Sequence, residues 1–199
     1  MKGPRGMMQN KIIGITGSSG SGKTTVCEIL AGHGGHIINA DAVAHSVMEP
    51  GRPAYKKIVA AFGPDILKDE IIDRKKLGAI VFNDTKKRTQ LENIVHPLVI
   101  DEILSQIRAS KAKFVALDVV LLIESGLHRH CDVVWLVTAP EEMRLSRIIA
   151  RDGLTLEAAQ ARMRNQRNIS PESAQAVINN DGDLESLKEQ ISAALNRTL

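Results

Sequence analysis

The sequence predicts a three-layer α/β fold, in which helices cover both faces of a five-stranded parallel sheet. Short apolar runs recur between helical patterns, which is typical of strands buried on both faces. Aromatic residues make up only 3% of the 199 residues, so Ile, Leu, Val and Ala must fill the core. The first apolar run also leads through a glycine-rich loop directly into a helix. One domain with inserted subregions is expected at this length.

The glycine-rich loop covers residues 17–24 and matches the phosphate-loop pattern G-x-x-x-x-G-K-[ST]. It lies between an expected strand at 11–16 and a helix expected from Lys23 to Gly32. Its backbone N–H groups and the helix N-terminus would hold a polyphosphate, with Lys23 on the β- and γ-phosphates and the Thr24 hydroxyl on Mg²⁺. A flexible Gly/Ser-rich turn is the alternative. The nucleotide-binding residues are then Gly17, Ser18, Ser19, Gly20, Ser21, Gly22, Lys23, Thr24 and Thr25.

Composition excludes several other classes of function. The net charge of +3 is too small to indicate a polyanionic polymer, and scarce aromatics argue against stacking on nucleic-acid bases. Cys27 and Cys131 show neither metal-site nor disulfide spacing, which favours a cytoplasmic location. No stretch approaches the ~20 apolar residues of a membrane span, and residues 1–10 form a flexible tail without a signal core. We expect no nucleic-acid or membrane partner, and no sequence feature indicates an oligomeric state.

Asp41 follows an expected strand at 36–39 and precedes a short helix. A carboxylate at the carboxyl end of a parallel strand lies where doubly wound sheets bind ligands. Asp41 is therefore a candidate to accept a hydrogen bond from an attacking hydroxyl. An N-cap of the following helix is an equally good interpretation.

Residues 49–111 form an expected helical insertion of roughly 60 residues, too long for a simple crossover. Helices are expected at 54–62, after a cap at Asp73, and at 84–109, where His96-Pro97 should kink or split the helix. A lone histidine such as His96 is more often structural than catalytic. The length of the insertion indicates a substrate-recognition region.

Asp118 ends an apolar strand at 114–118 and is a candidate to hold the Mg²⁺ water shell. A strand-end cap is the alternative. A short helix is expected at 121–126, with Glu124 on it, and a buried strand at 133–137. His128-Arg129-His130 is interpreted as surface, because no further metal ligands accompany it.

Six of the 13 arginines lie between residues 141 and 167, where there is no lysine. Arg144, Arg147 and Arg151 share one helical face, and Arg162, Arg164 and Arg167 follow on a helix begun near Thr155. Planar guanidinium groups suit bidentate phosphate contacts, which indicates a lid over a transferring phosphoryl group. A solvated face paired with neighbouring acidic residues is the alternative.

The last part of the chain predicts a helix opened by Ser170-Pro171, a strand at 176–179, a tight turn at 180–182 and a helix at 184–195. The turn follows the last strand near the phosphate loop. We expect it to contact the adenine base.

Together these residues resemble the dephospho-CoA kinase family over about residues 11–195. The phosphate loop alone would not single out this family. The resemblance is carried by segments at 39–45, 49–54, 73–78, 96–98, 118–124, 147–153, 162–166 and 177–182, and by Phe82. Departures from the family pattern are Asn39 for Asp, Val120 for Pro, Ile123 for Phe, and Asp181 for a small polar residue. None of them removes a residue assigned to chemistry.

The resemblance implies a phosphate-loop kinase that phosphorylates the ribose 3′-hydroxyl of dephospho-CoA with ATP, giving CoA and ADP in the last step of CoA synthesis. It implies Mg²⁺ on Thr24 and Asp118, directly or through water. Other small-molecule kinases would share these parts, whereas a GTPase switch would need an Asn-Lys-x-Asp motif, which is absent. The implied catalytic residues are Lys23, Asp41 and Arg147. ATP would be bound by the loop together with Arg147, Arg151 and Asn180. The acceptor substrate would contact Asp41, His96, Asp118, Leu121, Glu124 and Arg164.

The implied organisation is a single kinase domain at 11–199 after the tail. Its core comprises 11–48, 112–140 and 174–199. Residues 49–111 would bind the CoA moiety, and residues 141–173 would form a mobile lid.

Overall fold

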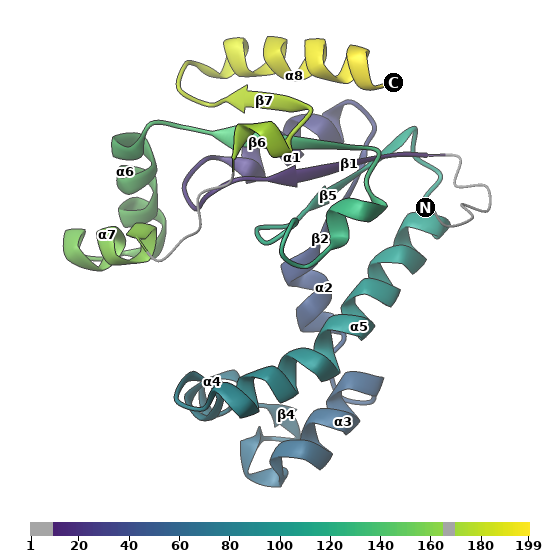
Figure 1. Cartoon of the computed structure of the whole chain (residues 1–199), viewed down its shortest axis with the longest axis vertical. Coiled ribbons are helices and arrows are strands. Elements are labelled where there is room, and N and C mark those ends of the chain that lie inside the picture. Colours follow the sequence, from purple (N-terminus) through teal and green to yellow (C-terminus); the bar gives the residue numbers. More distant parts are fainter. Residues whose placement is uncertain (1–9, 165–169) are drawn as a thin grey trace. The chain divides into compact units, whose positions relative to one another are not determined.

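The structure, a computed structural model, describes residues 10–164 and 170–199 and divides into two compact units (Figure 1). The first, here called the sheet unit, joins the chain up to Ile38 with Ser110–Leu199. The second, here called the helical unit, is Asn39–Ala109. The expected tail at 1–10 lies outside the described residues apart from Asn10, whose side-chain amide donates to Ser110 O over 2.7 Å.

A five-stranded parallel sheet in the order β2-β5-β1-β6-β7 forms the centre of the sheet unit, which confirms the predicted fold class. Ile13 of the central strand aligns with Ala116 on one side and Val133 on the other. The strands are β1 (Lys11–Thr16), β2 (His36–Asn39), β5 (Phe114–Asp118), β6 (Val133–Thr138) and β7 (Ala176–Asn179).

The core of the sheet unit forms on the sheet because its central strands are apolar on both faces. Trp135 and Phe114 are almost completely buried, so two of the few aromatic side chains anchor this core. Gly14 of β1 has no room for a side chain, because a Cβ there would lie 2.7 Å from Leu122 Cδ2 and 2.8 Å from Cys131 Sγ. The segment after β5 therefore packs directly against the backbone of β1.

The helices of the sheet unit pack by amphipathic faces. In α8, Leu187, Ile191, Ala194 and Leu195 recur at helical spacing and are all buried. Figure 1 shows α8 lying along β7, and it also contacts α1. The helices are α1 (Lys23–Gly32), α6 (Glu141–Asp152), α7 (Leu156–Arg164) and α8 (Leu184–Thr198), with the 3₁₀ helices η2 (Leu127–His130) and η3 (Pro171–Ser173).

Two helices predicted in the sheet unit take another form. Residues 121–126 form turns that lead into the single 3₁₀ turn of η2. The helix expected after Ser170 is only the three-residue η3, and the Ser170 side chain makes no capping bond. Both segments are too short to form the several i to i−4 hydrogen bonds that repay helix nucleation.

The helical unit is built around α5, which packs against α2, α3 and α4. Val99, Ile103 and Ile107 supply its buried stripe. The helix continues through Pro97 and does not split there. The elements are α2 (Ala40–Ser46), α3 (Pro53–Phe62), η1 (Pro64–Ile66), β3 (Leu67–Lys68), β4 (Ile71–Ile72), α4 (Arg74–Phe82) and α5 (Thr85–Ala109).

The expectation of an all-helical insertion is wrong at one point, because β3 and β4 form an antiparallel hairpin. Its two turn residues, Asp69 and Glu70, both have positive φ angles, 51° and 61°. The Tyr55 hydroxyl donates to the Glu70 carbonyl over 2.6 Å and ties the turn to α3. Asn and Gly are the usual signals of such a turn, so the sequence did not indicate it.

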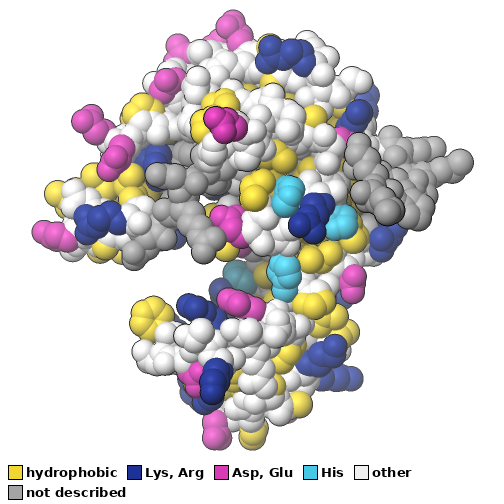
Figure 2. Space-filling model, viewed as in Figure 1, with side chains coloured by type: hydrophobic (Ala, Val, Ile, Leu, Met, Phe, Trp, Pro, Cys, Tyr) yellow, Lys and Arg dark blue, Asp and Glu magenta, His cyan; other side chains and the backbone are white. Residues whose placement is uncertain are grey.

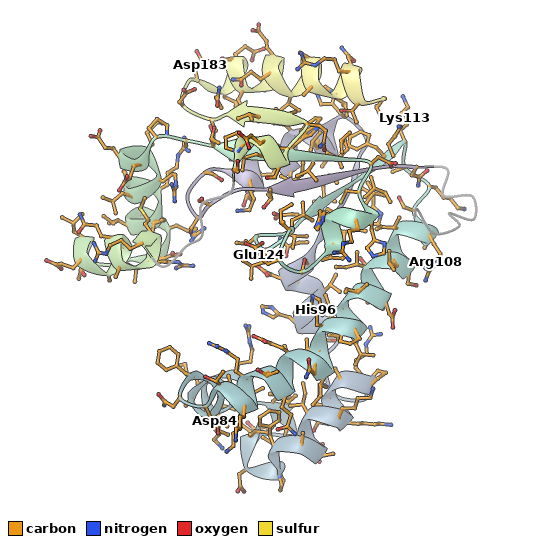
Figure 3. The ribbon with its side chains drawn as sticks, viewed as in Figure 1. Asp84, His96, Arg108, Lys113, Glu124 and Asp183 are labelled. Carbon is orange, nitrogen blue, oxygen red and sulfur yellow. The ribbon has the colours of Figure 1, made fainter. Side chains whose placement is uncertain are left out.

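Side-chain caps begin several helices, as the sequence predicted for Asp73. Asp84 and Asp183, labelled in Figure 3, do the same before α5 and α8, accepting from Lys86 N and Ser186 N. The cap of α2 is Asn39, whose Oδ1 accepts from Ala42 N over 2.8 Å. Asp41 lies inside the first turn of α2, so the interpretation of Asp41 as an N-cap is wrong.

Charged side chains of both signs are interspersed over the described surface shown in Figure 2. Within the described residues, no helix is both long and apolar enough to span a membrane.

Candidate active site

The phosphate-loop sequence connects the end of β1 to the start of α1, as predicted. Ser21 N donates to Ser18 O over 3.1 Å, which closes a tight turn within the loop. The Lys23 ammonium donates to Gly17 O over 2.8 Å and so lies folded back along the loop. Thr24 is exposed in the first turn of α1, whereas Ser21 is only 1% exposed.

Two glycines of the loop make room for neighbours from other parts of the chain. Gly20 has φ 78°, and a Cβ there would lie 2.5 Å from Arg144 O and 2.9 Å from Arg144 Cα. Gly22 has φ 92°, and a Cβ there would overlap Nδ2 of Asn180. Neither position tolerates a side chain, because both the left-handed backbone and the close approach exclude it. The outer side of the loop is thus held by α6 and by the turn after β7.

Three arginines on one face of α6 contact the loop. Arg144 Nε donates to Ser19 O over 3.1 Å. Arg147 donates from Nη1 to Gly20 O over 3.3 Å and from Nη2 to Asn180 O over 3.2 Å. Arg151 Nη2 lies 3.4 Å from the Ser19 hydroxyl. These spacings put three cationic groups beside the predicted polyphosphate site.

An ion-pair cluster around Asp152 joins α6 to α7, which contact one another. Arg151 donates to both Asp152 oxygens over 2.8 Å, and Arg162 Nη1 donates to Oδ2 over 2.7 Å. The hydrogen bond from Arg151 holds the pKa of Asp152 below its ordinary value, with burial opposing it. The arginines therefore divide: Arg162 pairs with an acidic neighbour, Arg144 and Arg147 contact the loop, and Arg151 does both.

Asn180 is buried beside the loop, at 8% exposure. Its side-chain Nδ2 donates to Ser21 O over 2.9 Å, and its backbone N donates to Thr138 O over 2.8 Å. The structure thus places this predicted nucleotide-binding residue directly against the phosphate loop.

Asp118 ends β5 and is aligned with Ile15 of β1. Ile15 lies two residues before Gly17, where the phosphate loop begins. Burial, and after it the charge of Asp118, raise the pKa of the Cys27 thiol to about 12, while Lys23 acts in the opposite direction. Asp118 and Lys23 therefore both lie near the first turns of α1. Carboxylate and hydroxyl oxygens, here of Asp118 and Thr24, are the ligand types that Mg²⁺ prefers.

This donor set fits a Mg²⁺ ion that takes most of its ligands from phosphate and water. Among the described residues, no group of three His, Cys, Asp or Glu side chains is placed to hold a metal. Mg²⁺ is usually bound by one or two carboxylates together with substrate phosphates and several waters.

The predicted acceptor-side residues lie in both units. Asp41 and His96 are exposed on α2 and α5 of the helical unit, and Figure 3 labels His96. Leu121, 57% exposed, and Glu124 lie in the turns after β5 of the sheet unit. Arg164 is exposed at the end of α7, and Arg167 lies outside the described residues.

Sequence reasoning gave two residues next to the phosphate loop no role of their own in the site. Arg144 belonged to the predicted arginine face but had no assigned role, although its three-residue spacing from Arg147 could have indicated a shared contact. Asp152 was one of the acidic residues that the solvated-face alternative paired with the arginines, and it does bond to both Arg151 and Arg162. Its place directly after Arg151 was the available signal.

Comparisons with known proteins agree along most of the chain. A model of the dephospho-CoA kinase family matches residues 11–186. A dephospho-CoA kinase from Carboxydothermus hydrogenoformans is 41% identical over 197 residues, 96% of each chain. A Thermus thermophilus protein of known structure has a TM-score of 0.82 at 33% identity, covering 96% of this chain and 99% of that one. A dephospho-CoA kinase from Campylobacter jejuni has a TM-score of 0.69 at 32% identity, with coverages of 94% and 96%.

Proposed function

Because the chain belongs to the dephospho-CoA kinase family, we propose that it transfers the γ-phosphoryl group of ATP to the ribose 3′-hydroxyl of dephospho-CoA. The products are CoA and ADP, as in the last step of CoA synthesis. The observation that carries this proposal is a family match extending over residues 11–186, on a chain whose phosphate loop accepts hydrogen bonds from its own Lys23 and from Arg147.

Lys23 and the loop backbone hold the triphosphate in this proposal. The ammonium of Lys23 bonds to the Gly17 carbonyl of its own loop, a neutral acceptor. A phosphate oxygen is a charged acceptor and forms the stronger hydrogen bond. We propose that ATP draws Lys23 onto the β- and γ-phosphates, where it offsets charge in the loose transition state.

Arg147 and Arg151 act on the outer phosphates. Arg147 is the better placed of the two, because its terminal nitrogens donate to Gly20 O in the loop and to Asn180 O in the turn beside it. Arg151 shares its guanidinium with Asp152 and is half-exposed, with 57% of its side-chain surface open to solvent. We therefore assign Arg147 the catalytic role and Arg151 a supporting contact. The surrounding segment, 141–173, is proposed as a lid that excludes water as a competing nucleophile.

Thr24 and Asp118 would hold Mg²⁺, Thr24 through its hydroxyl and Asp118 directly or through a bound water. The ion would neutralise charge between the β- and γ-phosphates. Asp118 ends a strand next to the loop, which supports this placement.

Asp41 orients the acceptor. It aims the 3′-hydroxyl at the γ-phosphorus and accepts the hydroxyl proton late, as the new O–P bond forms and the bond to the departing ADP oxygen breaks. Asp41 lies in the first turn of α2 and does not cap the helix, and its side chain is exposed, which leaves the carboxylate available to a ligand.

The rest of the dephospho-CoA would contact His96, Asp118, Leu121, Glu124 and Arg164. Residues 49–111 are proposed as the CoA-binding region, with the core at 11–48, 112–140 and 174–199. The compact helical unit at Asn39–Ala109 supports a separate acceptor-binding part. The metabolic kinase family and two buried thiols support a cytoplasmic location.

The test is incubation of the full chain with ATP, Mg²⁺ and dephospho-CoA, followed by mass spectrometry. The expected product carries one added phosphate, and chelation of Mg²⁺ abolishes its formation. A panel of other hydroxyl acceptors provides the comparison. Faster phosphorylation of another acceptor, or ATP hydrolysis with no phosphorylated acceptor, would overturn the proposal.

A further inference from the structure

We propose that the Asn180 side chain is a positioning residue that holds the phosphate loop and Arg147 in one arrangement, and does not read the adenine base. The inference rests on the proposed nucleotide site and goes beyond it. Asn180 would raise ATP affinity indirectly, through the loop and Arg147.

Asn180 connects three separate elements of the sheet unit. Its backbone N donates to Thr138 O at the end of β6, over 2.8 Å. Its side-chain Nδ2 donates to Ser21 O in the loop, over 2.9 Å. Its carbonyl accepts from Arg147 Nη2 on α6, over 3.2 Å. One residue thus joins the sheet, the loop and the arginine helix.

The hydrogen bond from Asn180 Nδ2 satisfies the buried carbonyl of Ser21 in the phosphate loop. Ser21 is only 1% exposed, so a carbonyl there that loses its donor has little water to replace it. A buried acceptor left without a donor is costly, whereas the bond itself contributes modestly. Gly22 leaves space for Nδ2, because a Cβ at that position would overlap it. The loop geometry and the Asn180 amide therefore depend on each other.

The bond to Arg147 sets the direction of its guanidinium. Nη1 donates to Gly20 O and Nη2 donates to Asn180 O, so two carbonyls hold the planar group at the loop. Removing the Asn180 side chain frees the turn that carries one of these carbonyls. The effect on ATP is then transmitted through Arg147.

The same burial argues against base recognition by this side chain. The residue is only 8% exposed, and its side-chain amide donates to Ser21 O of the loop. A base-reading role predicts discrimination between ATP and GTP. A positioning role predicts equal losses for both nucleotides, because they share the triphosphate.

The test measures ATP, ADP and GTP binding to the full chain by calorimetry, without acceptor. Asn180→Ala and Asn180→Asp should weaken ATP binding about 10- to 100-fold, because each removes the donor to a buried carbonyl. Asn196→Ala and Asn196→Asp, on an exposed position of α8, make the same chemical changes and should leave binding unchanged. The ratio of ATP to GTP affinity should be unaffected by the Asn180 variants.

A double-mutant cycle with Arg147→Ala separates positioning from a general loss of structure. In the Arg147→Ala background, Asn180→Ala should cost at least threefold less ATP affinity than in the native chain. If Asn180→Ala does not fold, Asn180→Ser takes its place in the same cycle. Additive losses, native-like ATP affinity, or a loss confined to ATP over GTP would each overturn the inference. Because no acceptor is present, a failure to phosphorylate dephospho-CoA would count against the proposed function alone.

Discussion

The two units present their predicted functional residues in different ways. In the sheet unit, Lys23, Arg147 and Asn180 all donate hydrogen bonds to loop or turn carbonyls. In the helical unit, Asp41 and His96 lie on exposed helix surfaces. The nucleotide side is therefore organised by the folding of the unit itself, whereas the acceptor-side groups remain available to a substrate. Preorganised donors stabilise charge without rearranging during the reaction.

The largest effect should come from the sheet unit. Lys23→Ala should lower kcat about 10³-fold or more, because it removes a fixed positive charge from the phosphates. Lys113→Ala, on the exposed residue before β5 labelled in Figure 3, is the matched control and should have native activity. Steady-state assays of ADP release check both variants. A kcat of Lys23→Ala within tenfold of the native value would contradict the claim that the sheet unit holds the group most important for turnover.

The helical unit should affect turnover without affecting the nucleotide. Asp41→Asn should lower kcat about 10²-fold, within the usual range for a general base, and should leave ATP affinity within about twofold. Asp101→Asn, an exposed position on α5, is the control within the same unit. Calorimetry and steady-state kinetics measure the two quantities. Loss of ATP affinity in Asp41→Asn would place this carboxylate on the nucleotide side instead.

A graded effect is expected along α6. Arg147→Ala should lower kcat/KM for ATP by about 10- to 100-fold, because charged hydrogen bonds contribute more than neutral ones. Arg151→Ala should cost only a few-fold, because that guanidinium already bonds to Asp152 and is half-exposed. Arg197→Ala on α8 tests whether any loss of surface charge matters. Equal losses at positions 147 and 151 would contradict the assignment of roles.

The smallest effect concerns the Cys27 thiol below the loop. Burial, followed by the charge of Asp118, raises its pKa to about 12, so it stays protonated at pH 8 in the folded chain. A thiol reagent should therefore label Cys27 slowly. Saturating ATP should slow the labelling further, because ATP binds only the folded sheet unit and so makes its opening rarer.

The same pKa predicts how stability depends on pH. The unfolded thiol ionises near its ordinary pKa while the folded thiol does not, so its contribution to stability falls as pH rises from about 9 toward 12. Labelling rates and unfolding midpoints between pH 8 and 10 check both statements. Rapid labelling of native Cys27 at pH 8 would show that the region beneath the loop opens readily.

Local patterns predicted much of the fold and of the nucleotide site. The apolar run before Gly17 and the motif itself lie within a few residues, so the strand, loop and first helix could be recognised together. The strand ending at Asp118 was predicted for the same reason. The spacing of Arg144 and Arg147 put them on one helical face, but the sequence alone could not show that this face contacts Ser19, because that contact joins segments 125 residues apart.

The errors also have local causes. The hairpin at 67–72 has strands of only two residues, and Asp69 and Glu70 are unusual in its turn. The cap of α2 was assigned to Asp41 as one alternative, but the strand passes directly into the helix, so Asn39 occupies that place. Residues 121–126 have an apolar pattern, yet they form turns that pack against Gly14. Tertiary packing decides such short segments.

A crystal structure of the full chain with a non-hydrolysable ATP analogue and dephospho-CoA tests the central claim most directly. The account predicts that Lys23 and Arg147 contact the γ-phosphate while an Asp41 oxygen lies about 2.6–3.2 Å from the ribose 3′-hydroxyl. An Asp41 carboxylate far from that hydroxyl, with both substrates bound, would contradict it.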